Sequence, residues 1–418
     1  MTRNIKPVGQ TNARAGERMM IFILAVFAAN MRACITGVGS LVPLIGADFG
    51  LSKTQAGLIT TLPILIFALV SYPAPGISRR FGTGQTLMVS FLLIFAGLAV
   101  RSYCGMPGLF IGSGLLAVGI GFSNVLVVSM IKLRFSHRIG FVTGLYSASM
   151  AFSAAVSVGI SVPMAVGLGL GWRNALAVWM LLAGLSVVLW GVRMKKDPEI
   201  RRVEKGGGSK SSLTRTARRM PMAWCYSAFF GIQTLLFFVM SAWLPSMLQS
   251  RGYSLEQAAA TALYVQALNI PTTLCVPVLC ARRRDQRGLI LIFCGMLFAG
   301  LTGFMFVRGT IKTLITLAVF SLGLGSALGF SNTFISLRTE NAQESAALSG
   351  MGQTVGYLFG AGGPVLIGFI FDLTGSWTLP LLLLVFASAA YILIGLSLAR
   401  DRSFFREFAE RKAKGSGK

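Results

Sequence analysis

Twelve long apolar runs constrain the fold of this chain more than any other feature of its sequence. A helix needs about 20 apolar residues to cross a bilayer core that is about 30 Å thick. The runs lie near 19–46, 54–77, 86–104, 107–131, 140–166, 172–194, 221–249, 256–281, 288–307, 313–337, 346–371 and 377–399. They predict an all-α integral membrane protein with twelve transmembrane helices.

Composition agrees with this prediction and excludes a soluble protein. Charged residues make up 12% of the chain and its mean hydropathy is +0.71, whereas soluble domains carry about 25% charged residues. The first run is too long for a signal-peptide core, and no small-residue cleavage site follows it. We therefore expect this run to remain in the protein as a span.

Basic residues between the runs predict how the chain crosses the membrane. The N-terminus and the alternate loops on its side hold 31 of the 38 Lys and Arg residues. The opposite side holds six, which are Lys53, Arg101, Arg173, Arg251, Arg308 and Lys312. We therefore expect both termini in the cytoplasm and the protein in the cell (inner) membrane. The net charge of +25 belongs to these loops, so no nucleic-acid partner is expected.

The sequence lacks the residue clusters that mark metal, redox or catalytic sites. Its six cysteines form no CxxC pair and its only histidine is His137, so we expect no metal and no cofactor. The spans contain no HExxH sequence, no acidic pair and no Ser-His arrangement, which argues against a membrane-embedded enzyme. A membrane sensor or scaffold would need soluble signalling domains, and no loop or tail is large enough for one.

The two halves of the chain resemble each other. Gly121-Phe122-Ser123-Asn124 recurs as Gly329-Phe330-Ser331-Asn332. Three prolines recur in the same order at offsets of 201 and 202 residues: Pro43 with Pro245, Pro75 with Pro277 and Pro163 with Pro364. These matches predict a duplicated six-helix unit. The predicted parts are a cytoplasmic N-terminus (1–18), an N-terminal bundle (19–194), a basic linker (195–220), a C-terminal bundle (221–399) and a basic tail (400–418).

Two six-helix halves joined by a cytoplasmic loop resemble the major facilitator superfamily, whose substrate site lies between the halves near the bilayer midplane. The loop after the second span resembles the Gly-x-x-x-Asp-Arg-x-Gly signature of that superfamily, because Arg80 and Gly82 match it. Arg79 stands where Asp is expected, and Pro75 where Gly is expected. The resemblance implies a role for this loop in gating, through Arg79, Arg80 and Gly82.

A narrower resemblance is to the cyanate permease and nitroimidazole transporter family. It rests on Asn30-Met31-Arg32 with Thr36-Gly37-Val38-Gly39, on Gly57-Leu58-Ile59-Thr60-Thr61-Leu62-Pro63, on Asn124 with Ile131-Lys132, on Gly144-Leu145-Tyr146-Ser147, on Gly231-Ile232-Gln233 and on Trp243-Leu244-Pro245. The resemblance implies transport of a small solute. It leaves open the uptake of a cyanate-like anion and the export of a nitroaromatic compound.

Arg32 is the most informative polar residue in the spans. At about 1.5 Å per residue it lies about 20 Å into the first run, where an arginine costs about 2.5–3.5 kcal/mol on insertion scales. None of the 13 Asp and Glu residues falls at its depth. We therefore expect an anionic or dipolar solute to complete its hydrogen bonding. The alternative is that helix carbonyls, amide side chains and water satisfy it.

Other polar residues in the spans are candidates for the same site. Thr36 and Ser40 share the helix face of Arg32. The remaining substrate-binding candidates are Asn124, Gln233, Gln266, Asn269, Asn332, Gln353 and Tyr357. Asn124 and Asn332 either line the cavity or tie helices together. Phe230, Phe237 and Trp243 are candidates for the wall of the site.

Alignment of the halves on Pro43 and Pro245 places Thr234 opposite Arg32. The second half therefore supplies no matching cation. Carriers of nitrate or organophosphate in the superfamily use paired basic residues, so a single Arg favours a smaller or less charged solute, such as cyanate or a nitro group.

Movement and coupling complete the prediction. Small residues in the fifth span and the Gly-Pro sequences favour either rocking of the halves or tight static packing, with Pro163, Gly363 and Pro364 as candidate bending points. The spans lack the buried Asp, Glu or His through which protons are relayed. We expect facilitated transport, exchange, or symport in which the proton rides with the solute, in a monomer.

Overall fold

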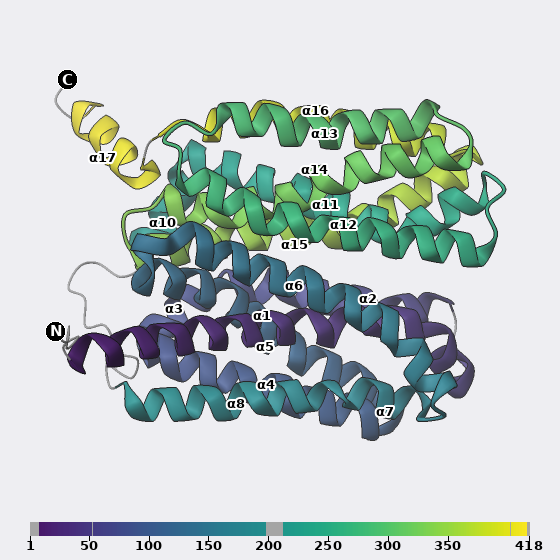
Figure 1. The fold of residues 1–418 in the computed structure, drawn as a ribbon, viewed down its shortest axis with the longest axis horizontal. Helices are drawn as coiled ribbons and strands as arrows, with labels where there is room; N and C mark the ends of the chain where they lie inside the picture. The colour runs from purple at the N-terminus through teal and green to yellow at the C-terminus, as the bar shows by residue number, and fades with distance from the viewer. Residues whose placement is uncertain (1–7, 52, 198–211, 402, 416–418) are drawn as a thin grey trace, which may run out of the picture.

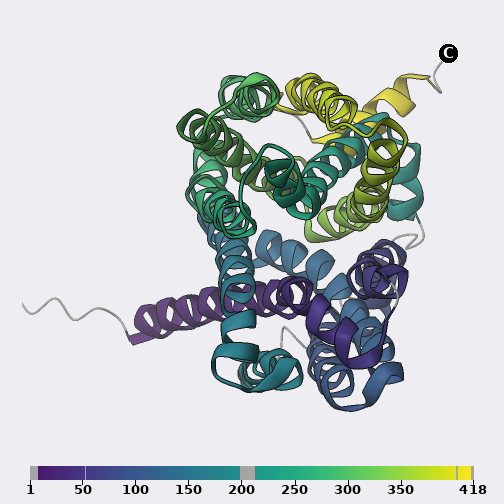
Figure 2. The same cartoon turned by 90° about the vertical axis from the view of Figure 1, so that its right-hand side faces the viewer.

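Two helical bundles lie side by side in the computed structural model, which describes residues 8–51, 53–197, 212–401 and 403–415. Figures 1 and 2 show the N-terminal half in purple to blue-teal and the C-terminal half in teal through green to yellow, with the helices running along the long axis. Apart from two short helical turns at Ser136–Arg138 and Pro163–Gly167, the N-terminal half contains α1 (Val8–Phe49), α2 (Lys53–Ser71), α3 (Ala74–Phe81), α4 (Thr83–Tyr103), α5 (Gly105–Arg134), α6 (Ile139–Val162), α7 (Gly171–Ala177) and α8 (Trp179–Lys196).

The C-terminal half repeats this arrangement. Its helices are α10 (Ser212–Arg219), α11 (Pro221–Gln249), α12 (Leu255–Ala281), α13 (Arg287–Phe306), α14 (Thr310–Leu337), α15 (Ala342–Thr374), α16 (Thr378–Leu398) and α17 (Phe404–Gly415). Most of the predicted linker, residues 198–211, lies outside the described residues, as do residues 1–7 of the predicted N-terminus and residues 402 and 416–418 of the predicted tail.

The predicted spans are confirmed, with one correction. Among the described residues, eleven helices are long and apolar enough to cross a membrane, or twelve if the bent pair α2 and α3 is one span. The apolar run 54–77 is therefore not one straight helix. Its two parts meet at 58°, because Pro73 and Pro75 remove backbone donors that a continuous helix would need.

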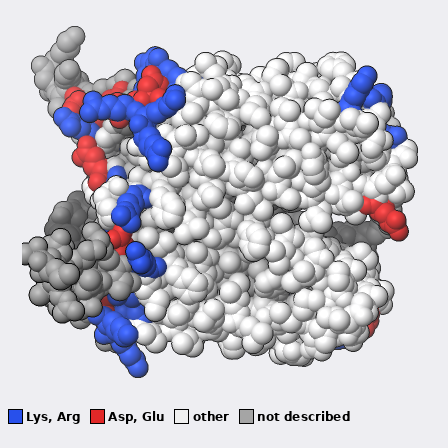
Figure 3. All heavy atoms as spheres, in the orientation of Figure 1, with Lys and Arg blue, Asp and Glu red and all other residues white. Residues whose placement is uncertain are grey.

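Charge divides the surface into two ends and an apolar band. Figure 3 shows Lys and Arg gathered at the end of the bundle that carries both termini, with few charges at the opposite end and almost none between them. We call these the basic end and the far end. The uncharged band is what a hydrocarbon layer requires of the surface that it contacts.

Equivalent ion pairs lie at the basic end of each half. Arg134 Nη1 lies 2.8 Å from Asp197 Oδ2 in the N-terminal half, and Arg338 Nη1 lies 3.7 Å from Asp401 Oδ1 in the C-terminal half. In the N-terminal half the pair joins the end of α5 to the residue after α8. In the C-terminal half it joins the end of α14 to a residue shortly after α16. The offset is 204 residues for both partners, so the internal repeat extends to this contact.

Direct contacts close the basic end between the halves. Lys132 Nζ donates to the Ser336 carbonyl and Ser129 Oγ donates to the Ala342 carbonyl, both at 2.7 Å. A Cβ added to Gly140 or Gly144 of α6 would collide with the Pro277 or Leu274 carbonyl of α12. The backbones of α6 and α12 therefore touch, which makes the basic end the closed end.

Glycines also allow close packing within each half, which gives a testable prediction. A Cβ on Gly300 of α13 would overlap the backbone of Phe320 in α14, whereas one on Gly295 of the same helix would meet nothing within 4 Å. Overpacking costs about 1–3 kcal/mol. Gly300→Ala should lower the apparent melting temperature of the purified protein in detergent, and Gly295→Ala should not. Equal effects of the two substitutions would contradict this packing.

Candidate functional site

Three adjoining cavities lie between the halves, and Arg32 lines two of them. The first has an empty volume of about 400 Å³ and is lined by α1, α5, α6, α11, α14 and α15, and the second, also about 400 Å³, is lined by α1, α6, α11, α12 and α14. The third, which we call the hollow, measures about 1830 Å³ including open solvent. The cavities adjoin because Phe237 lines all three.

Arg32 sits at the middle of the span Gly16–Phe49, at the depth predicted from the sequence. It is half-buried, and its guanidinium carbon lies 5.4 Å from the ring centroid of Phe237. Thr36 Oγ1 donates to the Arg32 carbonyl at 3.0 Å. No Asp or Glu is among the described residues that line the three cavities. The Arg32 guanidinium thus has the Phe237 ring as a weak partner and no carboxylate among these lining residues.

The structure brings all ten predicted substrate-binding residues to these cavities. The first cavity is lined by Arg32, Asn124, Gln233, Asn332, Gln353 and Tyr357. Gln266 and Asn269 join Arg32 and Gln233 in the second. Thr36, Ser40 and Gln266 line the hollow. Thr234, which the repeat places opposite Arg32, also lines the first cavity.

Asn124 and Asn332 both line the cavity and tie the halves together. Asn124 Nδ2 donates to the Tyr357 hydroxyl of the C-terminal half at 3.1 Å. Asn332 Nδ2 donates to Ser147 Oγ of the N-terminal half at 2.9 Å. The two alternatives left open by the sequence are thus not exclusive. Asn124 of α5 thus bonds α15, and Asn332 of α14 bonds α6, which is the equivalent helix of the other half.

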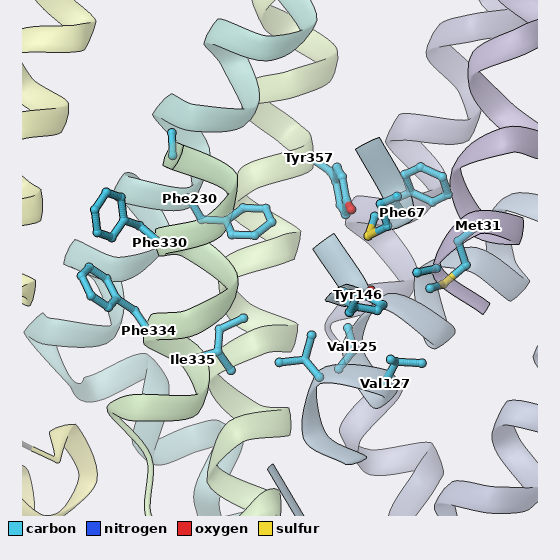
Figure 4. Close-up of a cluster of buried hydrophobic side chains, with 14 of the residues drawn as sticks. Met31, Phe67, Val125, Val127, Tyr146, Phe230, Phe330, Phe334, Ile335 and Tyr357 are labelled. Atoms are coloured by element: carbon cyan, nitrogen blue, oxygen red, sulfur yellow. The ribbon is translucent and has the colours of Figure 1, made fainter. Parts of the chain in front are cut away.

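Aromatic rings form one wall of the first cavity. The Tyr357 ring lies 5.0 Å from Phe67 and 6.2 Å from Phe230, measured between centroids, and Figure 4 shows Tyr357 beside Phe67 at the junction of the halves. Phe230, Phe237 and Phe238 line the same cavity. Trp243 is not among its lining residues. Its Nε1 instead donates to the Pro364 carbonyl at 2.8 Å, so it packs α11 against α15.

Prolines give the hollow hydrogen-bond acceptors. A proline has no N–H, so the carbonyl four residues before it loses its helical donor. In four helices, the residue carrying that carbonyl lines the hollow: Gly39 before Pro43, Ile59 before Pro63, Ser241 before Pro245 and Gly360 before Pro364. The residues that carry these carbonyls therefore line the hollow, and Arg32 lines the two cavities that adjoin it. This combination suits a solute with both donor and acceptor groups.

The predicted gating residues occupy three different places. Arg79 lines a separate basic pocket on the surface with Arg215, Arg218 and Arg219, and Arg80 is exposed beside Phe81. Gly82 has φ 89° at the turn between α3 and α4, a conformation that favours glycine. Pro163 begins a π-helical turn after α6. In α15, Gly363 packs closely on Leu235 and Val239, next to Pro364.

One arginine lies in a different environment from the one that the loop charges predicted. The count of loop charges assigned Arg101 to the loop cations of the far side. The structure instead places Arg101 in the last turn of α4, 1% exposed and lining the hollow. The position of Arg101 near the end of an apolar run is compatible with either place, and only the tertiary structure, in which Arg101 Nη1 donates to the Cys34 carbonyl of α1, distinguishes them.

The open far end and closed basic end predict different reactivities for two serines. Ser241 is exposed and lines the hollow, whereas Ser349 is 0% exposed on α15, towards the closed end. With the six native cysteines replaced by alanine, Ser241→Cys should react readily with a bulky, charged maleimide and Ser349→Cys should not. Comparable labelling rates in the folded protein would show that the basic end is open.

Comparisons with known proteins agree with this architecture. The Major Facilitator Superfamily profile matches residues 20–364. The 2-nitroimidazole transporter of Escherichia coli (strain K12) is 35% identical over 390 residues, which cover 93% of this chain and 98% of that protein. The uncharacterized transporter YycB of Bacillus subtilis (strain 168) is 34% identical, over 96% and 98% of the two chains. The cyanate transport protein CynX of E. coli is 26% identical, over 91% and 95%.

A solved structure shares the fold at low sequence identity. The E. coli fucose:proton symporter FucP superimposes with a TM-score of 0.74 at 13% identity, over 91% of this chain and 98% of that one. The predicted fold and the predicted family are both confirmed. The chain belongs to the Major Facilitator Superfamily, in the group that includes the 2-nitroimidazole and cyanate transporters.

Proposed function

We propose that this protein is a secondary transporter that moves a small anionic or dipolar solute by alternating access. The observation that carries the proposal is Arg32, a guanidinium at mid-span that lines two cavities between the halves with no carboxylate among their described lining residues. A charge at this depth commonly marks a substrate pathway. An oxygen-bearing or nitrogen-bearing anionic group would supply the acceptor that the guanidinium lacks.

The relatives support a small solute of this kind. Two relatives are transporters of 2-nitroimidazole and of cyanate. A nitro group and a cyanate ion both present partial or full negative charge on small, flat or linear frames. The cavity at Arg32 is lined by polar and aromatic side chains of both halves, which suits a small solute with a charged or polar group on a flat or linear frame.

The polar lining would orient such a solute. Arg32 would hold the negative end, and Gln353, whose Oε1 has no hydrogen-bond partner among the described residues, would accept from an N–H group. Thr234 and Gln233 lie on the facing helix α11. We propose that the chain acts as a monomeric carrier and not as an enzyme, with the far end as the extracytoplasmic end and both termini in the cytoplasm.

The contacts between the halves suggest the moving parts. The two bundles, 19–194 and 221–399, would rock against each other about the site at Arg32. The bonds from Asn124 to Tyr357 and from Asn332 to Ser147 would loosen as the basic end opens. Lys132 and Ser129 would release their carbonyl partners in the same step.

Export of nitroaromatic compounds is the second candidate. The aromatic wall formed by Phe230, Phe237, Phe238 and Tyr357 favours it, because flat heterocycles stack well on such rings. The architecture is the same for both directions of transport. The direction of net movement would follow from the solute gradient and from coupling.

Substitution of Arg32 tests the proposal. In proteoliposomes, Arg32→Gln should reduce uptake of labelled cyanate or 2-nitroimidazole about tenfold or more, because a hydrogen bond to a charged group contributes about 1.5–3 kcal/mol. Arg32→Lys should weaken apparent affinity, since an ammonium lacks the planar fork. Arg308→Gln, at an exposed far-end position, is the charge control. Normal transport by Arg32→Gln would leave Arg32 with a structural role only.

Coupling gives a second prediction. No Asp or Glu is among the described residues that line the three cavities, so we propose transport without a proton relay through a carboxylate in these cavities. Collapse of the pH gradient across the proteoliposome should therefore leave the uptake of a solute of fixed charge unchanged. A strong acceleration of that uptake by an imposed pH gradient, with membrane potential clamped, would contradict this mode of transport.

A further inference from the structure

A second buried arginine lies close to the proposed pathway and is only partly hydrogen-bonded. Arg101 is 1% exposed. Its Nη1 donates to the Cys34 carbonyl at 2.9 Å, whereas Nε and Nη2 have no hydrogen-bond partner in the part of the chain that the structure describes. A buried guanidinium with unmet donors is costly, and it is usually compensated by an acceptor.

The guanidinium of Arg101 contacts α1 close to Arg32. Long side chains on a helix lean toward its N-terminus, so Arg101 leans from the far end of α4 back toward the middle of the span. Its partner, Cys34, is two residues after Arg32 on α1, a rise of about 3 Å and about 200° around the helix. Arg101 therefore meets α1 within one turn of Arg32, on a different side of that helix.

Among the described residues, none that bonds Arg101 or lines the hollow with it carries a negative charge. The Cys34 thiol is a donor, since its Sγ lies 3.1 Å from Asn30 Oδ1. Asp48, an acidic residue at the far end of α1, is already held by Arg173 Nη2 at 2.9 Å and Trp172 Nε1 at 3.1 Å. No Asp or Glu is among the described residues that line the hollow, but Arg101 is, with Val38 and Ile59.

We propose that Arg101 forms a second anion-binding subsite, reached from the hollow, which draws and holds a small monovalent anion beside α1. This inference rests on the proposed function, because it names a further part of the same pathway. The ligand class is a small oxygen-bearing or nitrogen-bearing anion, such as nitrite, nitrate or cyanate. Two uncompensated cations would also raise the local concentration of anions in the hollow.

The test measures binding separately from transport. Purified full-length protein is titrated with sodium nitrite, nitrate or cyanate at constant ionic strength, and the anion-dependent rise in melting temperature gives an apparent affinity. The variants are Arg101→Gln, Arg101→Lys, Arg32→Gln and the exposed far-end control Arg308→Gln. Uptake kinetics are measured on the same preparations.

Arg101→Gln should weaken the apparent anion affinity by about tenfold to hundredfold and raise the KM for uptake by a similar factor. Arg101→Lys should recover part of this loss because it keeps the charge, and Arg308→Gln should match wild type. Arg32→Gln should still be stabilised by anions, although its uptake is reduced about tenfold or more.

Two results would overturn the inference without touching the proposed function. One is unchanged anion affinity and KM in Arg101→Gln while Arg32→Gln loses both. The other is that Arg101→Gln melts at a lower temperature without anion, keeps the wild-type anion affinity, and behaves no differently from Arg101→Lys. This result would make Arg101 a structural residue. Wild-type protein that neither binds any of the three anions nor transports cyanate or 2-nitroimidazole would overturn both proposals together.

Discussion

A positive charge buried in a membrane protein must be compensated within the protein, and four arginines of this structure meet this constraint in two different ways. Arg134 and Arg338, at the basic ends of the two halves, lie beside Asp197 and Asp401, and Arg338 also bonds the Gln286 side chain and the carbonyls of Leu398 and Ala399. Arg32 and Arg101 line cavities that have no carboxylate among their described lining residues. Compensated arginines hold helices together, whereas uncompensated ones leave hydrogen-bonding capacity for a solute.

The join between the halves has two layers with different chemistry. Next to Arg32, side-chain hydrogen bonds from Asn124 and Asn332 cross the join. At the basic end, backbones meet directly where Gly140 and Gly144 pack on α12. The loop with Arg79 in the place of the expected aspartate therefore need not act alone, because the structure already closes this end by packing and by the bonds of Lys132 and Ser129.

Much of the fold was predictable because a bilayer makes local sequence decisive. Span length, the repeat and the depth of Arg32 follow from counting residues along helices of known rise, and Thr234 lies in the cavity where the repeat placed it. The break at Pro73 and the burial of Arg101 were not predicted. Both depend on how neighbouring helices pack, as do the partners of Asn124 and Asn332, and lateral packing leaves no periodic signal in a single sequence.

The glycine contacts between α6 and α12 have a consequence for the balance between conformations. No side chain of Gly140 or Gly144 holds the two helices together, so their separation is set by backbone atoms that are already in contact. Adding one methyl group at either position would act as a wedge on the closed arrangement alone. An overpacking cost of about 1–3 kcal/mol corresponds to a shift of roughly fivefold to hundredfold in the ratio of closed to open molecules. In the alternating access proposed above, the absence of side chains at these two positions of α6 would favour the closed arrangement.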